Sequence, residues 1–245
     1  MSNSLAGMKI GTDGVLLSAW ALTKTADTPS NPERELYEPG TIVDAGTGTG
    51  VIALLMAQRF PDARIIGVEI EERAATEAEY NRKMSPWSNR IRIMQGDFVT
   101  MAGNTTNAVI GNPDLLISNP PFFTNGETSA DTNRKLARHA GTLSPASLLE
   151  TAGRVLRDNG RLCMVSTPDK SDEIEFKALL LGLHPERITR VATAIGKSPR
   201  RILWQFVKRD GAIPVLRDEL AIRSSAGVPT DEYRALVEPY YHTVK

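Results

Sequence analysis

Short apolar runs alternate with longer segments of helical periodicity along most of the chain. Buried strands are predicted at residues 41–45, 63–68, 90–95, 115–118 and 161–167. Helices are predicted between them at residues 51–59, 71–83, 145–156 and 170–182. Ahead of this series, the apolar stretch from Val15 to Leu22 predicts another helix, with Thr12 or Asp13 as its N-cap.

Strands that alternate with helices at this spacing predict an α/β fold with a doubly wound, mostly parallel sheet. Segments 187–194 and 202–208 add a C-terminal antiparallel strand pair, which gives a seven-stranded, Rossmann-like sheet. No linker is evident, so we expect one domain over residues 1–245. Its expected parts are an N-terminal helix block at 8–23, a core sheet at 41–208 and a tail at 209–245 with a helix near 231–239.

Composition narrows the classes of protein to consider. The 245 residues are 41% hydrophobic and 24% charged with a formal net charge of zero, which argues against disorder and against a strongly basic surface. The single cysteine excludes a disulfide scaffold, and Cys163 lies in an apolar run typical of a core. The three histidines have no metal-binding spacing, so no metal is expected. Without a signal peptide or a run of about 18 apolar residues, we expect a cytoplasmic protein.

A glycine-rich stretch joins the strand at 41–45 to the helix at 51–59. It reads Asp44-x-Gly46-x-Gly48-x-Gly50, which differs from the G-x-G-x-x-G pattern that binds a dinucleotide. Glycines at such a junction allow a tight turn and a close approach of the backbone to a ligand. An acidic residue ahead of them favours a ligand with a positively charged amino-acid moiety.

Two more acids end the next two predicted strands. Glu69 follows Gly50 by about 20 residues, where a carboxylate can accept both hydroxyls of a ribose. Asp97 ends the third strand, where it can accept a hydrogen bond from an adenine amino group. Taken singly, Glu69 is typical of a surface acid and Asp97 of a turn residue. Together with Asp44 at the neighbouring strand end, they predict a site for S-adenosyl-L-methionine.

The fourth strand ends in Asn119-Pro120-Pro121-Phe122. Two prolines in succession cannot continue a sheet ladder, so this segment predicts a stiff turn at the carboxyl end of the strand. The turn offers an amide side chain, carbonyl groups and an aromatic ring at the edge where open α/β sheets bind ligands. The alternative to a ligand-facing role for Phe122 is a core ring, and Phe123 is the competitor for the stacking role.

With these motifs, the chain resembles the class I S-adenosylmethionine-dependent methyltransferases that carry an Asn-Pro-Pro-Tyr/Phe motif and methylate planar amino groups. Residues 8–14 (Met-Lys-Ile-Gly-Thr-Asp-Gly), with Ser85-Pro86-Trp87 and the segment from Tyr233 to Tyr241, resemble more narrowly the bacterial tRNA1(Val) adenine-37 N6-methyltransferase family. The resemblance implies that the Asp44–Gly50 loop holds the methionine part of the cofactor, Glu69 its ribose and Asp97 its adenine. Thr12, Asp13 and Asn119 complete the cofactor-binding residues expected from it.

The same resemblance implies how an amino group is methylated. The Asn119 side-chain oxygen and the Pro120 carbonyl would accept the two N–H groups of the target amine, and Phe122 would stack on its base. A conjugated amine is a weak nucleophile, and two such acceptors favour a more nucleophilic nitrogen, so catalysis is largely orientation. The expected substrate is tRNA, because the free energy needed to unstack an unpaired base of the anticodon loop is low.

Other readings of the sequence stay open. The same turn occurs in enzymes that methylate rRNA adenine N6 or guanine N2 and in those that methylate glutamine N5 of a release factor. A binding-only RNA chaperone that kept the fold is a further alternative, although the intact acids and the intact turn argue against it. The basic segments 134–139 and 197–201 are candidate phosphate contacts or ordinary solvated charge.

Overall fold

A sheet of eight strands forms the centre of the computed structural model, which describes residues 11–23, 37–103, 110–121 and 143–240. The strand order is β3-β2-β1-β4-β5-β7-β6-β8. The strands are β1 (Thr41–Ala45), β2 (Arg64–Glu69), β3 (Ile91–Gln95), β4 (Leu115–Ser118), β5 (Arg161–Ser166), β6 (Leu183–Ala194), β7 (Pro199–Lys208) and β8 (Leu216–Arg223). Neighbouring strands are parallel except at β7, which runs antiparallel to both β5 and β6.

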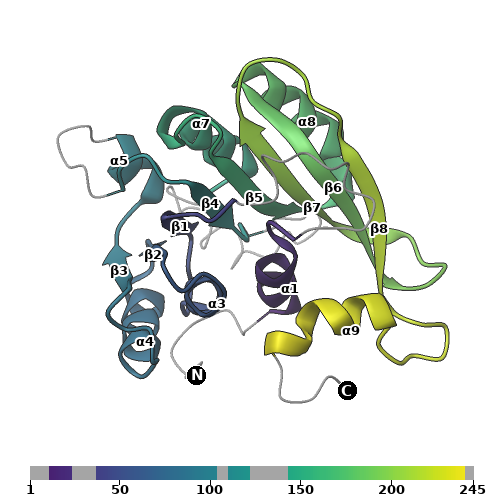
Figure 1. The fold of residues 1–245 in the computed structure, drawn as a ribbon, viewed down its shortest axis with the longest axis horizontal. Coiled ribbons are helices and arrows are strands. Elements are labelled where there is room, and N and C mark those ends of the chain that lie inside the picture. Colours follow the sequence, from purple (N-terminus) through teal and green to yellow (C-terminus); the bar gives the residue numbers. More distant parts are fainter. Residues whose placement is uncertain (1–10, 24–36, 104–109, 122–142, 241–245) are drawn as a thin grey trace, which may run out of the picture.

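Helices cover both faces of this sheet. They are α1 (Thr12–Trp20), α3 (Val51–Arg59), α4 (Glu72–Lys83), α5 (Phe98–Gly103), α7 (Pro145–Val155), α8 (Ser171–Leu180) and α9 (Asp231–Val237), with 3-10 turns η1 (Pro168–Lys170) and η2 (Glu238–Tyr240). Figure 1 shows α1, α3, α4 and α9 on one face and α5, α7 and α8 on the other. The doubly wound, mostly parallel α/β fold with an antiparallel C-terminal pair is therefore confirmed.

Two apolar clusters, one on each face of the sheet, make up the core. One joins Leu17 and Trp20 of α1 to the β-strands and to Val237 of α9. The other packs α7 and α8 against the opposite side of the strands, and there Trp204 stacks on Phe206. Cys163 is fully buried in the first cluster, and burial raises the pKa of its thiol to about 12. The prediction that it is a core residue is confirmed.

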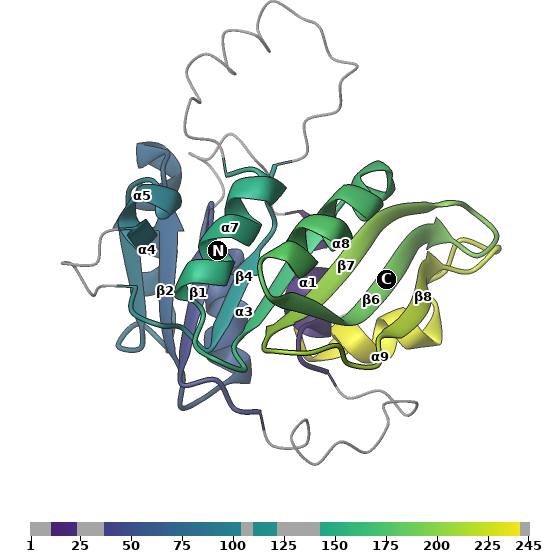
Figure 2. The ribbon, with the colours of Figure 1, turned by 90° about the horizontal axis from the view of Figure 1, so that it is seen from above.

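The segment expected to be a tail contributes an eighth strand to the sheet. β8 pairs in parallel with β6 from Arg187 opposite Leu216 to Ala194 opposite Arg223, on the side of the molecule away from α4 and α5 (Figure 2). The sequence predicted seven strands because the apolar alternation of β8 is weak, Leu220 being its one buried residue. The helix expected near 231–239 is present as α9, followed directly by η2.

Helix α1 is held by residues from elsewhere in the chain rather than by its own cap. Gly11 occupies its N-cap position without a side-chain cap, so the expected capping by Thr12 or Asp13 is wrong. The Asp13 carboxylate instead forms an ion pair of 2.7 Å with Arg201 of β7. At the other end of the helix, Arg59 of α3 donates hydrogen bonds to main-chain carbonyls, which satisfies groups that a helix C-terminus leaves open.

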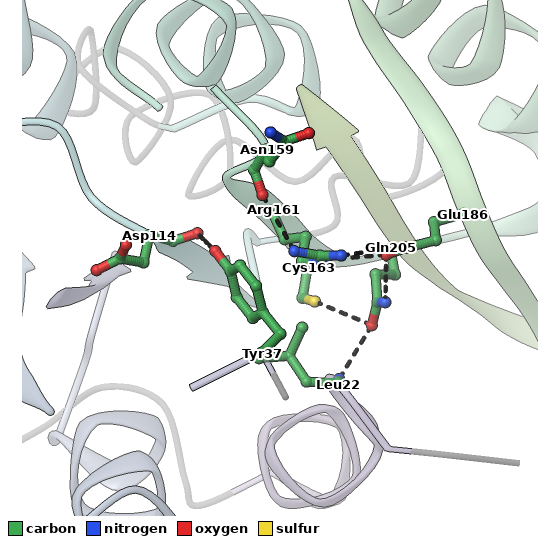
Figure 3. Close-up of polar contacts among 8 residues, drawn as sticks. All are labelled: Leu22, Tyr37, Asp114, Asn159, Arg161, Cys163, Glu186 and Gln205. Carbon is green, nitrogen blue, oxygen red and sulfur yellow. Dashed lines mark hydrogen bonds and ion pairs between the residues drawn. The ribbon is translucent and has the colours of Figure 1, made fainter. Parts of the chain in front are cut away.

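A buried polar network ties β5, β6 and β7 together near the amino edge of the parallel strands (Figure 3). The Arg161 guanidinium donates to both carboxylate oxygens of Glu186, at 3.2 and 3.3 Å. The same carboxylate accepts a 2.7 Å hydrogen bond from the side chain of Gln205. Gln205 in turn accepts from the main-chain N–H of Leu22, just after α1. The ring of Tyr37 lies 3.8 Å from the Arg161 guanidinium. The network therefore joins the end of α1 to three strands.

Breaking this buried ion pair should destabilise the fold. Both side chains are more than nine-tenths buried, so Glu186→Leu leaves the Arg161 charge without its partner. We expect the free energy of unfolding, measured by urea titration, to fall by about 3–5 kcal/mol. The double variant Arg161→Met with Glu186→Leu should recover most of that loss, since neither charge then remains buried.

An exposed ion pair provides the matched control for this prediction. Glu175→Leu removes the partner of Arg217 at the surface, and we expect a loss below about 1 kcal/mol. Equal losses for Glu186→Leu and Glu175→Leu would show that the buried network does not stabilise the sheet in this way.

Candidate active site

The carboxyl ends of β1, β2 and β4 lie level with one another. Asp44 is paired with Gly67 of β2 on one side and with Ile117 of β4 on the other. The residues that follow, Gly46 and Glu69, therefore leave the sheet at the same height, as does Asn119 after β4. This edge is where ligands bind in open parallel sheets.

The glycine-rich loop needs glycine for its backbone conformation. Gly46, Gly48 and Gly50 have φ angles of +72°, +56° and +84°, in the left-handed region that other residues rarely adopt. At Gly50 a Cβ would also lie 3.3 Å from the Cβ of Ala78, so α4 could not pack as closely. At Gly48 a Cβ would meet no atom of the described residues within 4 Å, so among them this part of the loop faces open space. The loop thus combines close packing on one side with an open side for a ligand.

Strand β2 holds this loop in place. The N–H groups of Gly46 and Thr47 both donate to the Val68 carbonyl, at 2.9 and 3.0 Å. The Gly48 N–H donates to the Glu69 carboxylate at 2.8 Å. Because a side chain and a main-chain carbonyl of β2 together bind three successive amides, the conformation of the loop depends on β2 as well as on its glycines.

Asp44 is fully buried directly ahead of the loop. One carboxylate oxygen accepts hydrogen bonds from the Thr47 hydroxyl and from the Ala53 N–H, the latter at 3.1 Å. The other oxygen, Oδ1, has no hydrogen-bond partner among the described residues. Burial raises the pKa of this carboxyl from 3.8 to about 7, more than the two hydrogen bonds lower it. A cationic ligand would satisfy the open oxygen and favour the ionised form.

Thr47 is a part of the site that the sequence did not predict. It is buried, and its side chain lies over Gly67, where a Cβ would be 3.0 Å from the threonine hydroxyl oxygen. A larger residue at Gly67 would push Thr47 away from the Asp44 carboxylate. The isolated glycine within the apolar run of β2 was the signal available, because glycine inside a strand often marks a close approach of another group.

Glu69 and Asp97 lie at the expected strand ends, and both already accept local hydrogen bonds. Besides Gly48, the Glu69 carboxylate accepts from the Glu71 N–H at 3.0 Å. Asp97 accepts from the Val99 N–H and the Thr100 hydroxyl, at 3.1 and 2.6 Å, at the start of α5. A carboxylate has about four acceptor positions, so each of these bonds leaves capacity for a ligand. That both residues bind the cofactor stays a prediction.

The turn after β4 presents the amide of Asn119. Its side-chain oxygen Oδ1 is buried and has no hydrogen-bond partner among the described residues. The neighbouring Ser118 hydroxyl donates to the Ala45 carbonyl at 2.7 Å, which fixes the start of the turn against β1. Pro120 is buried, whereas Phe122 and Phe123 lie outside the described residues. An acceptor is thus oriented beside the glycine-rich loop.

The N-terminus of α1 also lies beside this loop. Gly14 packs against Ile52 in the first turn of α3, where a Cβ on Gly14 would be 3.5 Å from the isoleucine side chain. Thr12, two residues before Gly14, is exposed, and Asp13 is paired with Arg201. The sequence placed Thr12 and Asp13 near the cofactor but did not reveal the arginine. Binding of the cofactor by these two residues stays a prediction.

Within the described parts of the chain, no group of three or more His, Cys, Asp or Glu side chains is arranged to hold a metal ion. In the same residues, no helix is both long and apolar enough to cross a lipid bilayer.

Comparison with known proteins assigns the family. The model of the methyltransferase small domain matches residues 31–180. A tRNA1(Val) (adenine(37)-N6)-methyltransferase of Porphyromonas gingivalis is 39% identical over 96% of this chain and 89% of that protein. Proteins of the same name from Aeromonas hydrophila and Bacteroides thetaiotaomicron are 35% and 34% identical, over 96% and 97% of this chain and 90% and 92% of their own. The chain belongs to this methyltransferase family.

Solved structures agree with the fold of this methyltransferase. A predicted O-methyltransferase of Agrobacterium tumefaciens superposes with a TM-score of 0.69 at 19% identity, over 95% of this chain and 99% of that one. A putative class I S-adenosylmethionine-dependent methyltransferase of Listeria monocytogenes gives 0.57 at 15% identity, over 84% and 63%. At such identities the matches establish the fold alone.

The family and its fold imply S-adenosyl-L-methionine as the cofactor of this methyltransferase. The chain's own residues fit that group. The buried Asp44 oxygen, unpartnered among the described residues, suits the positively charged amino-acid end. In the same residues, the open side of Gly48 leaves room for a ligand against the backbone. The acid at the end of β2 suits a ribose.

Binding of the cofactor should depend on pH because Asp44 titrates near neutrality. Below a pKa of about 7 the carboxyl is increasingly protonated and no longer attracts an ammonium group. We expect the Kd of S-adenosylhomocysteine, measured by calorimetry, to rise about tenfold from pH 8 to pH 6. Asp44→Asn should bind weakly at both pH values.

A ligand without the charged moiety provides the control. 5′-Methylthioadenosine keeps the nucleoside but has no ammonium group, so its Kd should change little over the same pH range. A parallel pH dependence for both ligands would assign the titration to a group other than Asp44.

Proposed function

We propose that this protein transfers a methyl group from S-adenosyl-L-methionine to N6 of the unpaired adenine 37 in the anticodon loop of tRNA1(Val). Relatives at 33–39% identity over nearly the whole chain carry that activity in their names. The observation in the molecule that supports it best is the buried Asn119 oxygen, which has no hydrogen-bond partner among the described residues and lies level with the glycine-rich loop. Such an acceptor suits the N–H group of a planar amine.

In the proposed reaction, two acceptors hold the target amino group. The Asn119 side-chain oxygen accepts a hydrogen bond from one N–H, and the Pro120 main-chain carbonyl accepts a hydrogen bond from the other. Bound in this way, the nitrogen lone pair is withdrawn from the ring and directed at the cofactor side of the pocket. A strong base is not required before attack. The nitrogen would gain the methyl group as the sulfur–methyl bond of the cofactor breaks, leaving neutral S-adenosylhomocysteine, and would only then lose its proton to water. Rate enhancement then comes mainly from orientation.

The cofactor half of the proposed site is built from acids and glycines. When bound, S-adenosyl-L-methionine supplies an electrophilic methyl group. Asp44 and the loop from Gly46 to Gly50 hold its amino-acid end. Glu69 accepts hydrogen bonds from the ribose hydroxyls, and Asp97 accepts one from the adenine amino group. Thr12 and Asp13 close the pocket from α1. The ring of Phe122, the residue after Pro121, stacks on the adenine removed from the anticodon loop.

We also propose that residues 1–245 act as one methyltransferase domain in the cytoplasm, with tRNA as the macromolecular partner. Packing supports the single domain, because β8 completes the sheet beside β6 and α9 packs against α1. Among the alternatives, an rRNA base or a release-factor glutamine would use the same Asn-Pro-Pro turn. The names of the relatives favour the tRNA substrate.

The product of the reaction tests the proposed function. The purified protein should convert one adenine of unmodified tRNA1(Val) to N6-methyladenosine when supplied with S-adenosyl-L-methionine, as measured by mass spectrometry of the digested RNA. A transcript with guanine in place of adenine 37 should remain unmethylated. Parallel reactions with rRNA and a release factor cover the alternatives, and N2-methylguanosine or N5-methylglutamine as the main product would refute the tRNA assignment.

Replacing Asn119 should remove catalysis without loosening the fold. Its Oδ1 has no partner among the described residues, so Asn119→Ala breaks no hydrogen bond made by that oxygen. We expect kcat to fall by about 100-fold or more, on the scale of losing one oriented group in an active site. The Tm should change little, and the Kd for S-adenosylhomocysteine should rise far less than kcat falls.

Asn112 provides a matched control for this substitution. It is an exposed asparagine on the amino side of the same strand, so Asn112→Ala should retain wild-type kcat. Comparable activity in Asn119→Ala and Asn112→Ala would exclude the proposed role of Asn119.

A further inference from the structure

Positive charge is concentrated in one part of this neutral chain. Between Glu186 and Asp210 there is no acidic residue. The same stretch contains seven basic residues, which are Arg187, Arg190, Lys197, Arg200, Arg201, Lys208 and Arg209. In a protein with equal numbers of acids and bases, such a stretch produces a local positive field.

Four of these seven side chains form an ion pair or a hydrogen bond within the fold. Arg187 is paired with Asp218, and Arg201 with Asp13. Lys208 and Arg209 donate hydrogen bonds to main-chain carbonyls. Arg190 is exposed and lies opposite Glu219 in the ladder of β6 with β8, so its neighbour across that ladder is an acid.

Lys197 and Arg200 remain exposed, and their side chains have no ion-pair or hydrogen-bond partner among the described residues. They lie at the turn between β6 and β7. Arg223, at the end of β8, is also exposed and lies close by, since the Ile195 N–H donates to its carbonyl at 2.9 Å. Its guanidinium donates to the Gly227 carbonyl at 2.6 Å. We call Lys197, Arg200 and Arg223 the basic rim.

Arg200 of the basic rim lies beyond the edge of the sheet where the active site lies. Ser166, the last residue of β5, is paired with Ile202 of β7. The residues of β7 before Ile202 therefore extend past the end of β5, and Arg200 lies about 7 Å beyond it at the usual strand rise. β7 is separated from β4, which carries Asn119, by β5 alone. That separation is roughly 10 Å.

Arg201 fixes the orientation of this overhang. It pairs with Asp13 on the α1 side of the sheet, and α1 contacts the first turn of α3 through Gly14 and Ile52. The start of β7 is thereby tied to the N-terminus of α1. Arg200 is the extra residue of a β-bulge, since Arg201 pairs with Val191 and Pro199 with Ala192. A bulge re-aims the side chains around it.

We propose that the basic rim binds the ribose-phosphate backbone of the RNA on either side of the base held at Asn119. This inference rests on the proposed function and adds the surface that binds the RNA substrate outside the base pocket. A base removed from its stack brings its flanking phosphates to the mouth of the pocket. Lys197 and Arg200 can meet those phosphates without breaking a side-chain contact within the described residues, whereas Arg223 would exchange its hydrogen bond to the Gly227 carbonyl. The exposed side chain of Ile195, in the same turn as Lys197, can cover a ribose.

Direct measurement of tRNA binding tests this proposal. The double variant Lys197→Gln with Arg200→Gln should bind unmodified tRNA1(Val) on the order of tenfold more weakly at physiological salt. The slope of log Kd against log salt should fall by about one for each charge removed. The Kd for S-adenosylhomocysteine, the Tm and kcat at saturating tRNA should equal those of the wild type.

The control variant removes the same charge elsewhere. Arg64→Gln with Arg92→Gln changes two exposed arginines on β2 and β3, and it should bind tRNA like the wild type. Equal weakening by both double variants, or unchanged binding by the rim variant, would overturn the proposal. So would a lower Tm or weaker cofactor binding in the rim variant, because its effect would then be structural.

The wild-type product assay separates this proposal from the proposed function. If the wild type forms N6-methyladenosine in tRNA1(Val) while the rim variant binds tRNA normally, the function stands and the rim is refuted. If the wild type neither binds nor methylates tRNA, both the proposed function and the proposed role of the basic rim are refuted.

Discussion

The main-chain hydrogen bonds of β1 to β2 and to β4 set the height at which each of these strands ends. Asp44 lies opposite Gly67 and Ile117, so the glycine-rich loop, Glu69 and Asn119 leave the sheet together. A slip of one residue in either ladder would turn alternate side chains to the other face. The Ser118 hydroxyl, bonded to the Ala45 carbonyl, resists that slip on the substrate side. Positioning of both ligands therefore begins in the sheet.

Two polar atoms at this edge are buried without partners in the described residues, Asp44 Oδ1 and Asn119 Oδ1. Such atoms cost stability in a free protein because they lose water and gain nothing in return. Elsewhere the same fold satisfies its buried charge fully, as in the network of Arg161, Glu186 and Gln205. The contrast separates groups that hold the sheet together from groups kept open for ligands.

The sequence sufficed for the parts of the fold that local pattern encodes. Strand and helix positions, the buried Cys163 and the three acids at strand ends all follow from periodicity and turn residues. Contacts between distant segments did not: Asp13 and Arg201 are 188 positions apart, and Thr47 meets Gly67 across a ladder. β8 was missed because its stability comes from pairing with β6 and not from its own apolar pattern.

Packing of α9 against α1 has a consequence for folding during synthesis. Leu17 and Trp20 share one apolar cluster with Tyr233 and Val237, so some of the earliest and latest residues of the described chain bury one another. While the ribosome is still making β8, one face of α1 has no cover and the outer edge of β6 is unpaired. Contacts of such long sequence separation form slowly. The nascent protein must therefore keep an incomplete sheet from aggregating until its last helix emerges.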